Sequence, residues 1–140
     1  MSDDNWRAVA DIAPLDEQRA YAPALAARYL LVSLREDIWT SLAVYADKTV
    51  VGHVMWAFDD DGCHWVGGML VDAAEQSRGI GRAAVSTILG WLVDEEGSRD
   101  TRLSYHPANS PARNLYDSLG FVSLGIMEDD ELVARWSPAP

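Results

Sequence analysis

Residues 67–82, GGMLVDAAEQSRGIGR, combine residue types that bind an anionic group with the spacing of a strand, a turn and a helix. The apolar run at 69–71 is typical of a strand end, and apolar residues at helical spacing begin at Ile80. Backbone N–H groups in the first turn of a helix lack intrahelical acceptors and carry partial positive charge. Because Gly79 and Gly81 have no Cβ atom, a phosphate oxygen can approach the main chain. We therefore interpret the stretch as a pyrophosphate-binding loop.

Three known loop patterns can be compared with this stretch. A P-loop ends in Gly-Lys-Ser/Thr, whereas Gly81 is followed by Arg-Ala, which excludes it. The string Gly79-x-Gly81-x-x-Ala84 matches the dinucleotide fingerprint, but that fingerprint requires a strand running directly into the first glycine, and Val71 is separated from Gly79. A third pattern, Gln/Arg-x-x-Gly-x-Gly/Ala, is matched throughout by residues 76–81. An ordinary glycine turn ahead of a helix remains an alternative for this motif alone.

The elements that must position the loop follow from periodicity and turn residues. Gly97 and Gly120 are expected to end two helices. A bulge or a close backbone approach is expected at Gly67-Gly68. We expect helices at 4–12, at 16–38 with a break at Pro23, at 79–96 and from 110 onward, and strands at 41–45, 49–58, 63–71, 101–105, 121–127 and 131–136. This order predicts one α/β domain, residues 1–140, with a mixed sheet and helices on both faces.

A second motif, Asn109-x-x-Ala112-x-x-Leu115-Tyr116-x-x-Leu119-Gly120-Phe121, has the pattern of an amphipathic helix with a glycine C-cap. Together with residues 76–81, in this order and at this distance, it resembles the GNAT superfamily of acetyl-CoA-dependent N-acyltransferases. Matches at 5–6, 16–18, 45–47, 51–55 and 103–109 extend the resemblance over most of the chain. That pattern is similar to the bacterial spermine/spermidine acetyltransferase branch.

The resemblance implies a GNAT-like, mostly antiparallel sheet whose first strand is short or missing, because the sequence starts at the Asn-Trp helix. It also implies an acetyl group donated by acetyl-CoA to a small-molecule amine, with spermidine or spermine as the first candidate. The branch usually carries a Trp-Arg-aromatic run before the loop, where this chain has Gly67-Gly68-Met69.

The resemblance implies residue roles as well. Tyr116 would be the general acid toward the coenzyme A thiolate. The general base is left open among Glu17, His64 and Asp72, with Glu17 as the tentative choice. Cofactor contacts are expected from the strand end, the loop and the second motif, namely Met69, Leu70, Val71, Gln76, Ser77, Arg78, Gly79, Ile80, Gly81, Arg82, Asn109, Ala112 and Tyr116.

Composition restricts the partners. Eleven basic and 22 acidic residues give a formal net charge of −11, which repels nucleic acid and attracts a cationic small molecule. No window approaches the roughly 18 apolar residues of a membrane span, and the start MSDDNWRAV lacks a secretory h-region. The single Cys63 suits a reducing compartment, so we expect a cytoplasmic protein without a metal and with a possible homodimer.

Two alternatives to a small-molecule acetyltransferase stay open. One is an acyl-CoA-binding regulatory domain without turnover, and the other is acetylation of a protein N-terminus or an amino acid.

Overall fold

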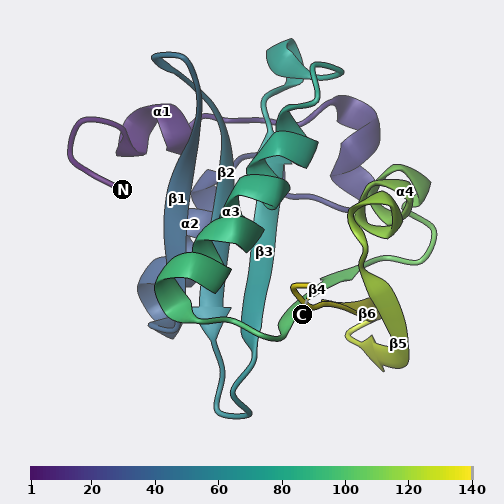
Figure 1. Cartoon of the computed structure of the whole chain (residues 1–140). Helices are drawn as coiled ribbons and strands as arrows, with labels where there is room; N and C mark the ends of the chain where they lie inside the picture. Colours follow the sequence, from purple (N-terminus) through teal and green to yellow (C-terminus); the bar gives the residue numbers. More distant parts are fainter. Residues whose placement is uncertain (140) are drawn as a thin grey trace.

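One six-stranded sheet, in the order β1-β2-β3-β4-β6-β5, forms the centre of the computed structural model, which describes residues 1–139 (Figure 1). The strands are β1 (Trp39–Ala46), β2 (Thr49–Phe58), β3 (His64–Val71), β4 (Thr101–Tyr105), β5 (Val122–Glu128) and β6 (Glu131–Trp136). The helices are α1 (Trp6–Ala10), α2 (Ala27–Glu36), α3 (Ile80–Glu96) and α4 (Ser110–Leu119), and short 3-10 helices span Asp16–Ala20 and Ala73–Glu75. Among the described residues, no helix is long and apolar enough to span a membrane.

The sheet is mixed, as the sequence predicted. All neighbouring strands are antiparallel except β3 and β4, which are parallel and connected by α3. A parallel pair requires such a crossover connection, and a helix is the usual one. Helix α3 lies in front of the sheet in Figure 1, with α2 behind it. The predicted layers, with helices on both faces, are therefore confirmed.

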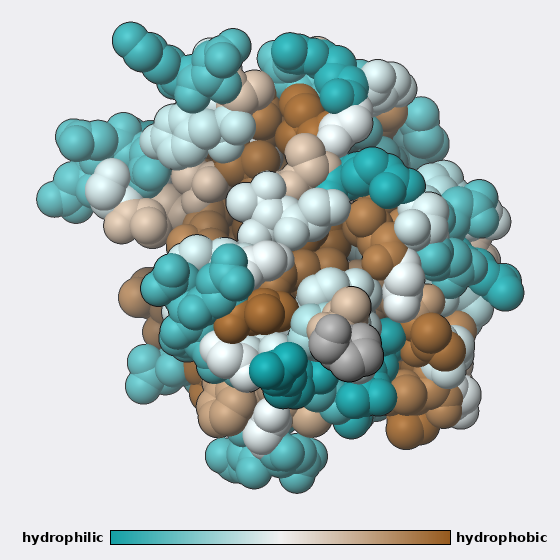
Figure 2. Space-filling view, viewed as in Figure 1, coloured by the Kyte–Doolittle hydropathy of each residue, from teal (hydrophilic) through white to brown (hydrophobic). Residues whose placement is uncertain are grey.

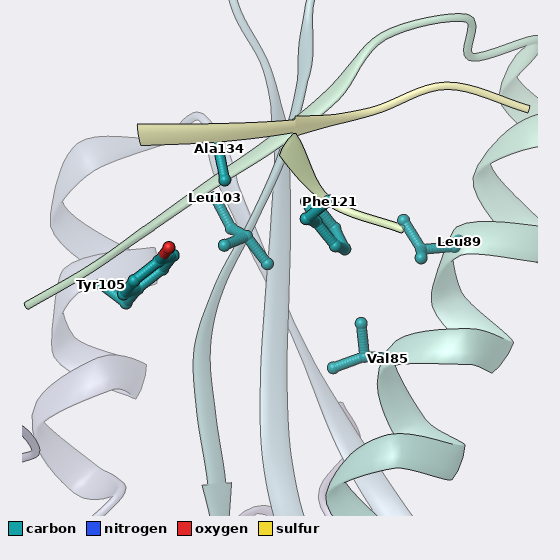
Figure 3. Packing of buried hydrophobic residues seen from close by; sticks show 6 residues of the cluster. All are labelled: Val85, Leu89, Leu103, Tyr105, Phe121 and Ala134. Atoms are coloured by element: carbon teal, nitrogen blue, oxygen red, sulfur yellow. The ribbon is translucent and has the colours of Figure 1, made fainter. Parts of the chain in front are cut away.

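The main hydrophobic core lies between α3 and the sheet. Val85 and Leu89 of α3 pack with Leu103 and Tyr105 of β4 (Figure 3). A neighbouring cluster combines Ile88 and Leu92 of the same helix with valines of β2 and β3. The four α3 residues repeat at helical spacing, so they form one apolar stripe, and burying that stripe holds α3 across the sheet.

The N-terminal region agrees with the prediction in part. The break expected at Pro23 within residues 16–38 is present, since Pro23 lies in the segment between the 3-10 helix Asp16–Ala20 and α2. Asp37, at φ 57°, ends α2, so Ile38 lies outside the helix. Trp6 is 42% exposed, because α1 has only five residues and buries Val9 alone. Asn5 occupies the N-cap position of α1, but its side chain makes no capping hydrogen bond and instead donates to the Tyr45 hydroxyl.

A bulge interrupts β3 at Gly67-Gly68, where the sequence predicted one. Met55 pairs with Gly67 and His53 pairs with Leu70, so β3 has one extra residue there. Gly68 has φ +59°, a conformation that favours glycine. A Cβ atom on Gly68 would also lie 2.9 Å from the His53 ring. Both its backbone angle and its close neighbour therefore require glycine at this position.

The fully buried His53 holds this bulge in place. Its Nδ1 lies 2.7 Å from the Gly68 carbonyl oxygen, so Nδ1 carries the proton and donates. Its Nε2 then accepts from the Ser41 hydroxyl at 2.9 Å, and Ser41 contacts the Ser33 hydroxyl. Tyr29 of α2 stacks on the imidazole at 5.3 Å between ring centroids. Burial lowers the pKa of His53, which keeps the ring neutral.

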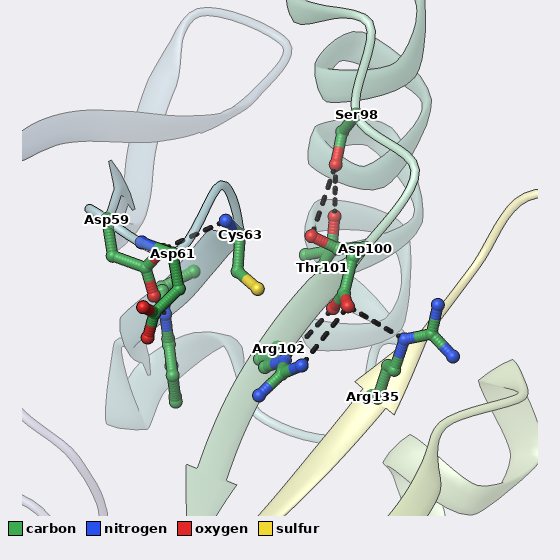
Figure 4. A network of polar contacts seen from close by, with 9 residues as sticks. Asp59, Asp61, Cys63, Ser98, Asp100, Thr101, Arg102 and Arg135 are labelled. Atoms are coloured by element: carbon green, nitrogen blue, oxygen red, sulfur yellow. Dashed lines mark hydrogen bonds and ion pairs between the residues drawn. The ribbon is translucent and has the colours of Figure 1, made fainter.

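A polar network fixes the start of β4 (Figure 4). Asp100 accepts from Arg102 on β4 at 3.0 Å and from Arg135 on β6 at 2.9 Å. The Asp100 carbonyl also accepts from the His64 N–H of β3 at 3.0 Å. Ser98 and Thr101, both buried, share a 2.9 Å hydrogen bond. The three strands are therefore tied together at this end of the sheet.

The neutral state of His53 predicts a pH-dependent stability. The pKa of His53 is lower in the folded than in the unfolded state, where it is near ~6.5. Once the pH falls below that unfolded-state pKa, His53 binds a proton in the unfolded state but stays neutral in the folded state. Folding stability from this group should therefore decline as pH falls, by up to about 1.4 kcal/mol per pH unit. Urea unfolding at pH 7.5 and 5.5 should show a larger loss for the natural chain than for His53→Asn. Equal losses in both proteins would contradict a neutral, buried His53.

Candidate active site

A cavity of about 1090 Å³ opens where β3 and β4 separate. The two strands pair only at His64 with Thr101 and at Trp65 with Arg102, and then diverge. The walls comprise residues 66–71 of β3, residues 103–105 of β4, and the beginnings of α3 and α4. The predicted strand end and both predicted motifs therefore line one space.

The diverging edge of β3 leaves backbone groups free to bind an extended ligand. The Asp72 N–H donates to Val51 of β2 at 2.8 Å. Backbone groups alternate in direction along residues 70–72, so the Val71 N–H faces away from β2, toward the gap. The Gly68 carbonyl bonds the His53 ring, and in a trans peptide the Met69 N–H points the opposite way, also away from β2. The Val71 carbonyl is already occupied, because it accepts from the Gln76 side chain at 2.7 Å. The edge of β3 is the natural partner for an added extended chain.

The loop before α3 has the backbone form expected of an anion site. Ser77 at φ 64° and Gly79 at φ 73° both adopt the left-handed conformation. The Ala83 N–H is bonded to Gly79, and no described side chain caps the helix. The N–H groups ahead of Ala83 in the first turn are therefore available to a ligand. A Cβ atom on Gly81 would sit 3.9 Å from its nearest neighbours, so the protein itself leaves room beside it.

The polar side chains of the loop are partly engaged within the protein. Gln76 forms a reciprocal amide pair with Gln18 at 3.3 Å and also bonds Val71, so it ties the loop to the strand end. Arg78 pairs with Glu75, and Arg82 donates to Ser118 of α4. Both guanidinium groups are exposed; Glu75 offsets the charge of Arg78, whereas Arg82 donates to a neutral hydroxyl and adds positive charge beside the helix N-terminus.

Helix α4 brings the second motif to the same cavity. Asn109 accepts from the Ala112 N–H at 3.4 Å, so it caps the helix as well as lining the cavity. Tyr116 lies between Tyr105 and Phe121, with ring centroids 5.7 and 5.8 Å away. Burial, with a smaller contribution from nearby Tyr29 and Glu131, raises the pKa of Tyr116 to about 12. Its hydroxyl is therefore protonated at neutral pH and can donate a hydrogen bond into the cavity.

The three candidate bases occupy different places. Glu17 is exposed and lines the cavity rim. Asp72 accepts from the Ala13 N–H at 3.2 Å, which is a structural contact between the N-terminal segment and the loop. His64 lies outside the cavity, at the paired start of β3. Only Glu17 of the three combines a place in the cavity with a carboxylate not engaged in a hydrogen bond.

Glu131 is a polar group of the cavity that was not predicted from the sequence. Glu131, the first residue of β6, lines the cavity and accepts from the Ser104 hydroxyl at 3.1 Å. It also contributes to the raised pKa values of Tyr29 and Tyr116, which places its charge near both phenols. In the sequence Glu131 belongs to the acidic run 128–131, which has the pattern of a solvated hairpin turn. Only the register of β6 against β4 brings it into the cleft.

Among residues 1–139, no group of three or more His, Cys, Asp or Glu side chains could hold a metal ion.

Comparisons with known proteins agree with this geometry. The Acetyltransferase (GNAT) family model matches residues 5–121. The PaiA N-acetyltransferase from Thermoplasma acidophilum, in complex with coenzyme A, has a TM-score of 0.72 at 15% identity, over 99% of this chain and 96% of that chain. The GNAT domain of S. lividans PAT has a TM-score of 0.72 at 18% identity, over 99% and 88%.

Mycobacterium smegmatis RimJ, in complex with CoA-disulfide, has a TM-score of 0.63 at 19% identity; the match covers 79% of this chain and 58% of RimJ. No curated protein matches this chain. The spermine/spermidine branch remains a prediction. Because the family match spans both motifs and more than half of the sequence, this chain belongs to the acetyltransferase (GNAT) family.

Proposed function

We propose that this chain transfers the acetyl group of acetyl-CoA to a primary amine of a small cationic molecule, with a polyamine as the first candidate. The proposal rests on one observation, that a free strand edge and a free helix N-terminus line the same cavity. The unpaired edge of β3 at Met69 and Val71 ends beside the uncapped N-terminus of α3. Acetyl-CoA has the matching parts, because an amide-bearing pantetheine arm joins its thioester to a diphosphate.

The cofactor would be held by backbone groups and by Arg82. The diphosphate would accept from the first-turn N–H groups of α3, with Arg82 beside it, whereas Arg78, also predicted to contact the cofactor, does not line the cavity and pairs with Glu75. The pantetheine amides would pair with the edge of β3 as an added strand does. In a chain of net charge −11, this local positive field overcomes the general repulsion of an anionic cofactor.

The reaction forms a C–N bond and breaks the C–S bond of the thioester. The amine attacks in its neutral form and loses a proton after attack, while the carbonyl oxygen gains negative charge that a β3 N–H can stabilise. The sulfur leaves as a thiolate. Tyr116, with a pKa of about 12, stabilises that thiolate by donating a hydrogen bond. Tyr116 transfers its proton to the sulfur only if the apolar cavity raises the pKa of the coenzyme A thiol close to that of Tyr116. A proton from solvent then returns the phenol to its neutral form.

The acceptor would enter from the acidic side of the cavity. Glu17, Glu128 and Glu131 line this space and attract a protonated amine. Glu131 is half-buried and accepts from the Ser104 hydroxyl, whereas Glu17 and Glu128 are exposed. Removal of the amine proton can proceed to Glu131 or Glu17 directly or through a water. A polyamine fits because it carries several positive charges on a flexible chain.

The proposed function is tested by thiol release from acetyl-CoA with a panel of amines, including spermidine, an amino acid and a peptide with a free N-terminus. We expect release with spermidine or another polyamine and little with the peptide. Release with none of the amines, together with a raised melting temperature in acetyl-CoA, would favour the non-catalytic binding domain instead. Stabilisation by NAD or FAD rather than acetyl-CoA would contradict both readings.

Replacing Tyr116 with Phe should lower kcat by about 100-fold, the usual scale for a lost proton donor. The aromatic packing is kept, so the Kd for acetyl-CoA should stay within about twofold. Because the Tyr116 pKa is about 12, the natural enzyme should show no loss of kcat from this group between pH 7 and 10. Tyr45→Phe, which removes the hydroxyl of an exposed tyrosine that does not line the cavity, serves as the control. Unchanged turnover in Tyr116→Phe would exclude Tyr116 from the chemistry.

Replacing Glu131 with Gln should raise KM for a cationic amine about fivefold, because one carboxylate charge is lost from the acceptor side. The KM for acetyl-CoA should be unaffected, since the amide still accepts from Ser104. Glu95→Gln makes the same chemical change on the exposed face of α3. An amine KM equal to that of the natural enzyme would show that Glu131 does not attract the acceptor.

A further inference from the structure

A second cavity, of about 410 Å³, lies at the other end of the sheet, and its residues have no place in the acetyl transfer described above. Six residues line this cavity, which we call the Trp56 cavity: Asp37, Ile38, Trp56, Phe58, His64 and Glu96. Strand β3 begins here at His64 and ends at Val71 beside the α3 loop. The large cavity also reaches this end of β3, since it includes Trp65, and Ile38 lines both cavities. Side chains of successive strand residues point to opposite faces of the sheet, so the His64 and Trp65 side chains lie on different faces.

Aromatic rings form one wall of the Trp56 cavity. The rings of Phe58 and His64 lie 4.7 Å apart between centroids, and those of Trp56 and His64 lie 6.1 Å apart. Trp91 of α3 supports Trp56 from the side, edge to face, at 5.4 Å. Faces of aromatic rings carry negative potential and attract cations, with tryptophan the strongest of the natural side chains.

Two carboxylates, those of Asp37 and Glu96, also line the Trp56 cavity. Helix α2 ends at Glu36, immediately before Asp37, and helix α3 ends at Glu96. The carboxylates of Asp37 and Glu96 therefore lie beside two helix C-termini, whose free carbonyl groups carry partial negative charge. Two helix ends of the same sign and two carboxylates around one cavity favour a positive ligand.

The His64 side chain supplies an independent sign of a ligand. It is only 5% exposed, yet its ring nitrogens have no hydrogen-bond partner among the described residues. Every described side-chain N or O atom that is shut off from solvent has a partner, so the His64 nitrogens must open onto the cavity. A neutral imidazole has one acceptor nitrogen, which an N–H group entering the cavity could occupy.

The exposed apolar residues here suit a small ligand better than a second protein. Ile38 and Phe58 are 56% and 55% exposed at the cavity mouth. On the face that carries α3, hydrophobic side chains form separate patches between hydrophilic ones (Figure 2), which is unlike a broad apolar interface. A second copy of this chain would also bring its own net charge of −11 toward Asp37 and Glu96.

We propose that the Trp56 cavity is a binding site for an organic ammonium ion. The ammonium group lies over the aromatic wall, between the carboxylates of Asp37 and Glu96, and donates an N–H to His64. The aliphatic part of the ligand covers Ile38 and Phe58. This site differs from the part of the large cavity in which the acceptor amine is proposed to bind. The proposal can therefore be tested independently of the acetyl-transfer reaction.

The test uses the full chain saturated with coenzyme A and titrates 1,4-diaminobutane while NMR follows the indole N–H of Trp56 and the ring C–H of His64. We expect saturable shifts at both side chains. The double variant Asp37→Asn/Glu96→Gln should weaken this binding roughly fivefold, the combined scale of two lost exposed ion pairs. Asparagine tolerates the left-handed backbone of Asp37, so folding is preserved.

The control variant is Asp47→Asn/Glu95→Gln. It makes the same change in charge and residue type, and Asp47 has φ 55° where Asp37 has φ 57°. Its affinity for 1,4-diaminobutane at the Trp56 cavity should equal that of the natural chain. The proposal is overturned by shifts confined to the large cavity, by equal weakening in both double variants, or by a dimer that covers Trp56 and leaves it insensitive to the amine.

Discussion

The short pairing of β3 with β4 is the constraint on which the rest of the structure depends. Two residue pairs join the strands, and beyond Trp65 they diverge. A parallel pair that continued to Val71 would close the sheet and leave no exposed strand edge. Because the pairing stops, a core of aromatic and aliphatic side chains can face a cavity instead of a neighbouring strand.

Both ends of this opening are mechanically supported. At the closed end, Asp100 connects β3, β4 and β6 through Arg102, Arg135 and the His64 N–H. At the open end, the bulge at Gly68 is pinned by His53, and Gln76 secures Val71. The backbone groups that face the gap are thus held in place before a ligand arrives, and less conformational entropy is lost on binding.

Charge is distributed unevenly over this acidic chain, with consequences for its chemistry. The α3 N-terminus and Arg82 make a positive region within a molecule of net charge −11, whereas the charge of Arg78 is offset by Glu75. Glu128 and Glu131, from the β5–β6 hairpin, line the same cavity. The proposed donor is anionic and the proposed acceptor is cationic, so these charges would draw the two to different parts of one space. The Trp56 cavity is also lined by carboxylates, but no arginine, lysine or helix N-terminus is among its lining residues.

Local patterns in the sequence predicted much of this structure. The stripe on α3, the glycine C-caps and the bulge depend on neighbouring residues, so periodicity and turn chemistry were sufficient. The break at Pro23 was also predicted, because proline interrupts a helix. The exposure of Trp6 depends on tertiary packing and was not predicted. Glu131 could not be found either, because its approach to Tyr116 depends on strand register between residues far apart in sequence.

The central claim is that the edge of β3 beside the gap binds the acyl-bearing arm of the cofactor. Hydrogen exchange of individual backbone amides, measured with and without coenzyme A, tests it most directly. The account predicts that the Met69 and Val71 amides exchange fast in the free protein and at least about tenfold more slowly with the cofactor, as expected for newly formed backbone hydrogen bonds. If coenzyme A protected the first turn of α3 but left those two amides unchanged, the claim would be wrong.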